Sequence, residues 1–199
     1  MFPVRTVTNE AKILVLDTEC RPMHYSDWRP EGQITGWAMA WLDAPGVLSV
    51  ATLDHGETDL EYRYNEAHML AKLLKAIRSA DVVVGHYIRK HDLPLLNETC
   101  LRLGLPLLPK LQTIDTKADL TSIVQLGASL ENLGVTLIDD DENGKHHMCG
   151  GMWRIANQLT VEGKAGTAKR VMADVVLNIR VLEELRRRGA LGAVKWWEP

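Results

Sequence analysis

The segment KILVLDTE, residues 12–19, constrains the fold more than any other part of the chain. Its apolar residues run almost without interruption, a pattern typical of a central strand that is covered on both faces of its sheet. The segment ends in Asp17 and Glu19. Because side chains at positions i and i+2 of a strand point to the same side, both carboxylates are expected on one face. The segment therefore predicts a layered α/β domain whose central strand ends in two acids.

The order of the expected elements predicts a mixed central sheet flanked by helices. The first three strands are expected to form an antiparallel meander, with a turn at Ala44-Pro45-Gly46 between the second and the third. The polar segment 139–151 is interpreted as a surface excursion within the domain. The expected strands span residues 12–19, 33–43, 47–53 and 81–88, and the expected helices span residues 65–80, 91–105 (helical after Pro94), 129–137 and 165–189.

Length and composition indicate a single domain over residues 1–199, long enough to bury a core. No run approaches the roughly 18 apolar residues of a membrane span, and the first residues lack the apolar core of a signal peptide. The three cysteines are far apart, which favours reduced thiols over a disulfide framework. We therefore expect a cytoplasmic protein without a membrane partner. A net charge of -3 does not exclude nucleic acid, because clustered metal-binding acids lower the formal sum.

The two acids at the strand end repel each other unless a cation lies between them. Mg²⁺ suits this role because it takes oxygen ligands at roughly 2.0–2.1 Å. The simpler alternative is that the strand ends at Asp17 and Glu19 and that both acids meet water. Further acids must decide between these interpretations.

Two further acids are candidates for the same site. Asp92 follows the expected strand 81–88 at the start of a helix, where an acid also suits the helix N-terminus. Asp174 lies within an apolar run of the last long helix, although Asp is a mediocre helix former. A satisfied buried side chain or an exposed position are the alternatives for Asp174.

The acids in "LDTE", "GHYIRKHD" and "RVMADV", in this order, resemble the three motifs of the DEDD superfamily of 3′–5′ exonucleases. That family has an RNase H-like fold and includes the proofreading domains of DNA polymerases. The resemblance covers roughly residues 12–188. With "SLENLG" and "KHHM", the chain is also similar to small stand-alone exonuclease-like proteins of actinobacterial phages, which would place it in the host cytoplasm.

The resemblance implies a set of metal ligands and a reaction. It implies two Mg²⁺ or Mn²⁺ ions that support hydrolysis of phosphodiester bonds from the 3′ end of DNA or RNA, with release of nucleoside 5′-monophosphates. A nucleic acid with a 3′ end, above all single-stranded DNA, is the expected partner, and replication or recombination proteins are further candidates. The implied metal ligands are Asp17, Glu19, Asp92 and Asp174.

The chain departs from the family pattern around its second and third motifs. Tyr87 stands where Asn is common, and His91 stands where an aromatic residue is usual. The final helix usually carries a Tyr four residues or a His five residues before the last Asp, but here those positions hold Arg170 and Lys169. Neither is a suitable general base, because Arg stays protonated and Lys must first lose its proton. Either another side chain acts as the base, or the protein is a weak or inactive member.

His146 and His147 are the candidate substitutes, since an imidazole titrates near neutral pH and can accept a proton from water. They lie before the final helix. Solvated histidines are the plain alternative, and a zinc site formed with Cys149 is another.

Candidate substrate contacts surround the acids. The backbone of Thr18 would meet the terminal nucleotide, and Tyr87 would stack on a base, as would Trp28 or Trp153. Basic residues near the second and third motifs would bind phosphate, or form a solvated charged face: Arg89, Lys90, Lys169 and Arg170. Two alternatives to an exonuclease remain open, an RNase H-like endonuclease acting on RNA–DNA hybrids and a non-catalytic nucleic-acid-binding module.

Overall fold

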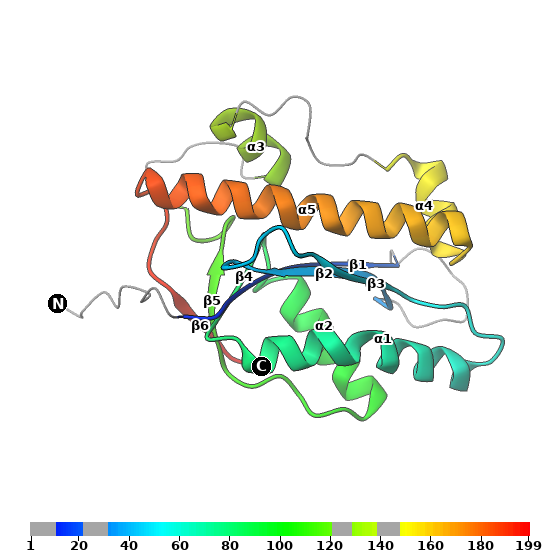
Figure 1. Cartoon of the computed structure of the whole chain (residues 1–199). Helices are drawn as coiled ribbons and strands as arrows, with labels where there is room; N and C mark the ends of the chain where they lie inside the picture. Colours follow the sequence, from blue (N-terminus) through cyan, green and yellow to red (C-terminus); the bar gives the residue numbers. More distant parts are fainter. Residues whose placement is uncertain (1–10, 22–31, 121–128, 139–147) are drawn as a thin grey trace.

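The computed structural model describes residues 11–21, 32–120, 129–138 and 148–199. Within them a six-stranded mixed sheet lies between two layers of helices (Figure 1). The strands are β1 (Ile13–Cys20), β2 (Ile34–Trp41), β3 (Ser49–Thr52), β4 (Val82–Gly85), β5 (Leu111–Asp115) and β6 (Lys195–Trp197). The helices are α1 (Asp59–Ser79), α2 (Asp92–Leu103), α3 (Leu130–Ile138), α4 (Gly150–Asn157) and α5 (Val161–Arg187).

The sheet order is β3-β2-β1-β4-β5-β6. β1, β2 and β3 pair antiparallel, β4 and β5 pair parallel to β1 and to each other, and β6 returns antiparallel on β5. This arrangement is the RNase H-like mixed sheet that the sequence predicts. In the described part of the chain, β4 pairs with β1 only at Ile13, Leu14 and Val15. The edge of β1 beyond Val15 is therefore open on the β4 side.

β1 is covered on both faces, as its apolar run predicts. Leu14 and Leu16 belong to the core shared with α1 and α2, whereas Ile13 and Val15 belong to the core shared with α5. Figure 1 shows α5 along one face of the sheet and α1 and α2 on the opposite face. Since side chains alternate along a strand, Asp17 and Glu19 continue the row that faces α5.

Helix starts differ from the sequence expectations. α1 begins at Asp59 rather than residue 65, because Thr58 forms a capping box in which its side chain accepts the N–H of Glu61 and the Glu61 side chain accepts the N–H of Thr58. α2 begins at Asp92 and not after Pro94, since a proline is tolerated in the first turn, where N–H groups have no helical partner.

α5 begins at Val161, earlier than the expected residue 165, because the Thr160 side chain accepts the N–H of Gly163. α4 was not expected, and it takes the last two residues of the polar segment 139–151. β4 ends at Gly85, so it is shorter than the strand expected at residues 81–88.

Close packing of α5 on the sheet depends on a glycine of β2. A Cβ atom at Gly36 would lie 2.6 Å from Cγ2 of Thr167 on α5, a distance that side chains do not reach without displacement. The absence of a side chain at Gly36 therefore lets the N-terminal half of α5 lie directly against β2. Among the described residues, no helix has the length and apolar character needed to cross a membrane.

Candidate metal centre

Three carboxylates from distant parts of the sequence meet where the end of β1 faces α5. One oxygen atom from each of Asp17, Glu19 and Asp174 lies within 4.8 Å of the others. Asp17 and Glu19 are half-buried, and Asp174 is buried with 4% of its surface exposed. The resemblance implies this meeting of the first and third motifs. We call these three residues the carboxylate cluster.

Asp174 reaches the cluster because it lies on the stripe of α5 that faces the sheet. Thr167, Val171, Asp174 and Asn178 are all buried and recur every three or four residues, the spacing of one helix face. Val171 packs in the core between α5 and the sheet. The apolar run around Asp174 therefore places its carboxylate against β1 and not on an exposed face.

A β-bulge fixes the strand end at Glu19. Glu19 lies opposite Gly36 on β2, but Cys20 lies opposite Ile34, so Thr35 is the extra residue of β2. The Thr35 hydroxyl donates a hydrogen bond to the carbonyl oxygen of Glu19 at 3.2 Å. Bulges bend a strand locally and are common beside functional sites. This bulge and its hydrogen bond therefore fix the backbone of Glu19 against β2.

Arg170 lies within the carboxylate cluster. Its Nε atom is 3.1 Å from Oε1 of Glu19 and 3.0 Å from Oδ2 of Asp174. The Arg170 side chain is only 11% exposed. The guanidinium that we expected to bind phosphate is therefore paired with the acids themselves. Lys169, its neighbour on α5, is exposed.

Asp92 approaches β1 from the opposite face and, among the described residues, is not part of the set within 4.8 Å. Its Oδ1 atom accepts hydrogen bonds from the backbone N–H of Thr18 at 3.0 Å and from the Thr18 hydroxyl at 2.6 Å. Thr18 lies between Asp17 and Glu19, so its side chain faces the α2 side of the sheet. Asp92 thus accepts a backbone N–H of β1 that β4 does not pair with. It is linked to the carboxylate cluster only through Thr18, the residue between Asp17 and Glu19.

His91 precedes Asp92 at the cap of α2, and its Nδ1 atom lies 3.8 Å from Oδ2 of Asp92. Hydrogen bonding to the Asp92 carboxylate, followed by that to Cys20, raises the pKa of His91 to about 10. His91 is therefore a partner of Asp92 in this structure.

Arg89 is held by a buried acid that sequence reasoning missed. Its two terminal nitrogens donate to both carboxylate oxygens of Asp119, at 2.8 and 2.6 Å. Burial alone would raise the pKa of Asp119, but hydrogen bonds from Arg89 and Lys195 outweigh burial and hold it below its usual value. Arg89, expected to contact phosphate, instead fixes the loop after β4 to the region after β5.

Asp115, at the end of β5, also organises the loop after β4. Its buried carboxylate accepts the backbone N–H groups of Tyr87 at 2.9 Å and Arg89 at 3.3 Å. It also accepts those of Lys117 and Ala118, two and three residues further on. The latter bonds form the Asx-turn that a sequence such as DTKA permits, which is the signal that could have identified this residue.

Tyr87 remains exposed, as a base-stacking residue requires. Its φ angle is +66°, and 41% of its surface is accessible. A left-handed backbone is uncommon for a non-glycine residue other than Asn, Asp or His. Lys117 Nζ lies 4.2 Å from the centre of the Tyr87 ring, so the ring carries a cation on one face.

Some expected residues lie outside the described part of the chain, namely His146, His147 and Trp28. Cys149 is exposed at the cap of α4, where the N–H of Met152, followed by that of Gly151, lowers the pKa of its thiol. Trp153 on α4 is half-buried. The zinc alternative and the histidine base stay predictions.

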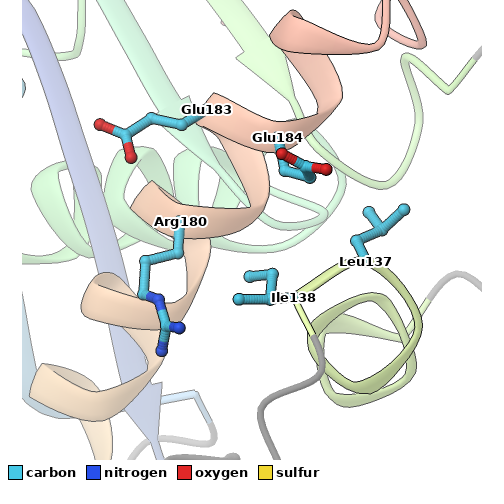
Figure 2. A pocket seen from close by; sticks show the side chains of 5 residues that line it. All are labelled: Leu137, Ile138, Arg180, Glu183 and Glu184. Carbon is cyan, nitrogen blue, oxygen red and sulfur yellow. The ribbon is translucent and has the colours of Figure 1, made fainter.

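A separate hollow of about 300 Å³ lies between α3 and α5 (Figure 2). Its position, two to three turns beyond Asp174 along α5, separates it from the carboxylate cluster. Its lining mixes two aliphatic side chains with charges of both signs, so it offers no uniform field for an anionic ligand. The lining residues are Leu137, Ile138, Arg180, Glu183 and Glu184.

Comparison with known proteins finds likeness in structure. No protein-family model matches the chain, and no curated protein matches it. Among solved structures, the family B DNA polymerase from the hyperthermophilic archaeon Pyrobaculum calidifontis matches 88% of this chain with a TM-score of 0.57 and 16% sequence identity. The chain spans 24% of the length of that polymerase. At this identity the likeness shows that the two proteins share a fold over most of this chain.

Proposed function

We propose that this protein is a metal-dependent nuclease, and specifically a 3′–5′ exonuclease. The observation that carries the proposal is the carboxylate cluster of Asp17, Glu19 and Asp174, whose oxygens lie within 4.8 Å of one another. Two of these acids share a strand face, and a helix buries the third against them. Such an arrangement repels itself unless positive charge is supplied.

The donor set fits a hard divalent cation such as Mg²⁺ or Mn²⁺, because all three ligands are carboxylate oxygens. Around one octahedral ion with ligands at roughly 2.1 Å, adjacent oxygens are about 3.0 Å apart and opposite oxygens about 4.2 Å apart, so three oxygens within 4.8 Å of one another would draw closer by up to about 2 Å to share it. When bound, such an ion supplies the charge that activates water and offsets the negative charge developing on a phosphodiester. The resemblance implies two ions.

The remaining residues have distinct roles in this proposal. Asp92 holds the strand between the two cluster acids by its bonds to Thr18, which use Oδ1 only. Its Oδ2 atom is the oxygen through which Asp92 would act on the site, directly or through water. His147 or His146 would accept the proton of the attacking water.

The substrate side of the proposal rests on exposed groups. Tyr87 would stack on a base near the 3′ end, and Lys117 beside its ring and Lys169 on α5 would contact phosphates. The fold shared with a DNA polymerase supports nucleic acid as the substrate. Single-stranded DNA is the form we propose, with nucleoside 5′-monophosphates as products.

End-labelled single-stranded DNA incubated with Mn²⁺ tests the proposal. We expect stepwise shortening from the 3′ end, abolished by a chelator and by Asp17→Asn. Asp43→Asn is the matched control, since Asp43 is an exposed acid in the turn after β2 and should leave the rate unchanged. Equal shortening by Asp17→Asn and the unaltered protein would refute the assignment. Internal cuts confined to RNA–DNA hybrids would indicate the endonuclease instead.

A further inference from the structure

We propose that Arg170 takes the place of one of the two divalent cations that the resemblance implies, so that this site binds a single ion beside a fixed guanidinium. The inference rests on the proposed function in one respect, that the carboxylate cluster binds a metal. It concerns how many ions bind, and what supplies the remaining positive charge.

The position of Arg170 is the first argument. A single atom, Nε, lies 3.1 Å from Oε1 of Glu19 and 3.0 Å from Oδ2 of Asp174. The guanidinium therefore lies between a strand acid and the helix acid and contacts two of the three members of the cluster. A cation entering this space would have to displace it.

The charge of the site is the second argument. Counted over Asp17, Glu19, Asp174 and Arg170 alone, three ionised carboxylates and one guanidinium give a net charge of -2, which one divalent cation neutralises. A second ion would leave an equal excess of positive charge beside Glu19, Arg170 and Asp174, whose side chains are 16%, 11% and 5% exposed. Uncompensated charge in such surroundings is strongly unfavourable. The charge of these four side chains thus matches one ion better than two.

The burial of Arg170 is the third argument. Its side chain is 11% exposed, so leaving the cluster would strip it of both ion pairs while the helix backbone still holds it near the sheet. Arg also keeps its charge at every pH at which the protein folds. A second metal ion would have to compete with a permanent, covalently tethered cation for Glu19 and Asp174.

Arg170 can also perform the electrostatic task of the ion it replaces. A guanidinium is a planar multiple donor that suits phosphate oxygens, and a fixed positive charge stabilises negative charge that develops during phosphodiester cleavage. In this arrangement Arg170 pairs with the acids in the resting protein and lies beside the phosphate when the substrate is bound.

Binding of Mn²⁺ to the full chain without nucleic acid tests the inference, measured by titration calorimetry and by electron paramagnetic resonance of the free ion. We expect one Mn²⁺ per chain in the unaltered protein. Arg170→Met, which keeps much of the length and removes the charge, should bind a second ion and hold the first roughly ten- to a hundredfold more tightly. Lys75→Met is the matched control, because it removes the same charge from an exposed side chain of α1, and it should bind like the unaltered protein.

Several results would overturn the inference. They are two ions of similar affinity in the unaltered protein, no ion at all, or an Arg170→Met variant that is folded by circular dichroism and binds Mn²⁺ as before. If Arg170→Met does not fold, Arg170→Gln and Arg170→Lys replace it, with tighter binding expected for Gln and unchanged stoichiometry for Lys. A single Mn²⁺ per chain that responds to Arg170→Met, without cleavage of DNA, would support this inference and contradict the nuclease.

Discussion

The ion pair between Arg89 and Asp119 is expected to contribute more to stability than any exposed pair. The side chains are 14% and 1% exposed, and both terminal nitrogens of Arg89 bond to the carboxylate. Asp119 also accepts the N–H of Asp115 and pairs with Lys195 at 2.8 Å. Asp119→Ala would remove all of these contacts and leave the Arg89 guanidinium covered and without its partner.

The magnitude follows from the burial of each partner. Removal of one member of a buried pair costs about 3–5 kcal/mol of unfolding free energy. Arg89 retains some exposure and Lys195 is 55% exposed, so the loss for Asp119→Ala should fall near the lower end, about 3 kcal/mol. Glu198→Ala is the matched control, because Glu198 pairs with Lys110 at an exposed site and should cost less than about 1 kcal/mol.

Urea unfolding followed by circular dichroism measures both variants. With a slope of about 2 kcal/mol per molar urea, Asp119→Ala should lower the midpoint by about 1.5 M. The pKa of Asp119 is lowered in the folded state, so its stabilising contribution is present above the ordinary carboxyl range and is lost as the pH falls below about 4. The difference between the two proteins should therefore shrink at acid pH. A loss below about 1 kcal/mol at neutral pH would refute the reasoning.

Three further changes test other parts of the structure. His147→Ala should lower the rate of DNA shortening by roughly two to four orders of magnitude if it is the general base, and an unaltered single-turnover rate would exclude it. Gly36→Ala should cost about 1–3 kcal/mol in urea unfolding, because its Cβ would lie 2.6 Å from Cγ2 of Thr167; an unchanged midpoint would mean that α5 can shift freely. Tyr87→Ala should raise the KM for single-stranded DNA by roughly 5- to 150-fold, the effect of losing about 1–3 kcal/mol of stacking, with kcat less affected.

The sequence patterns that best predicted side-chain directions were those in which buried residues recur at a regular spacing. The alternation along β1 places Asp17 and Glu19 on the face that meets α5. The three- and four-residue spacing of buried positions along α5 brings Asp174 to the same place. Periodicity fixes a direction for each side chain, but only the resemblance to the three motifs implied that these acids, far apart in the sequence, belong to one site.

Elements whose stability comes from tertiary contacts were not predicted. β5 reads LQTID, and its polar Thr113 is fully buried because its hydroxyl donates to the carbonyl of Lys195 and accepts from Arg89. β6 is three residues long and exists by pairing with β5. The sequence of either strand alone does not show that it pairs with the other. The pairing of Arg170 with Glu19 and Asp174 was not predicted either, because the sequence of a helix does not show which acid a charged side chain contacts.

The order of the motifs in the sequence does not show which face of β1 each acid approaches, and Asp92 is the example. The order of the motifs suggested that four acids would meet, but α2 packs on the β1 face that carries Leu14 and Leu16. An acid at the start of α2 therefore meets Thr18, and its Oδ1 atom forms two hydrogen bonds there. A direct bond from this oxygen to a metal at the carboxylate cluster would require both bonds to break. In this structure Asp92 thus lies on the far side of the strand from the cluster, where it fixes the peptide that joins Asp17 to Thr18.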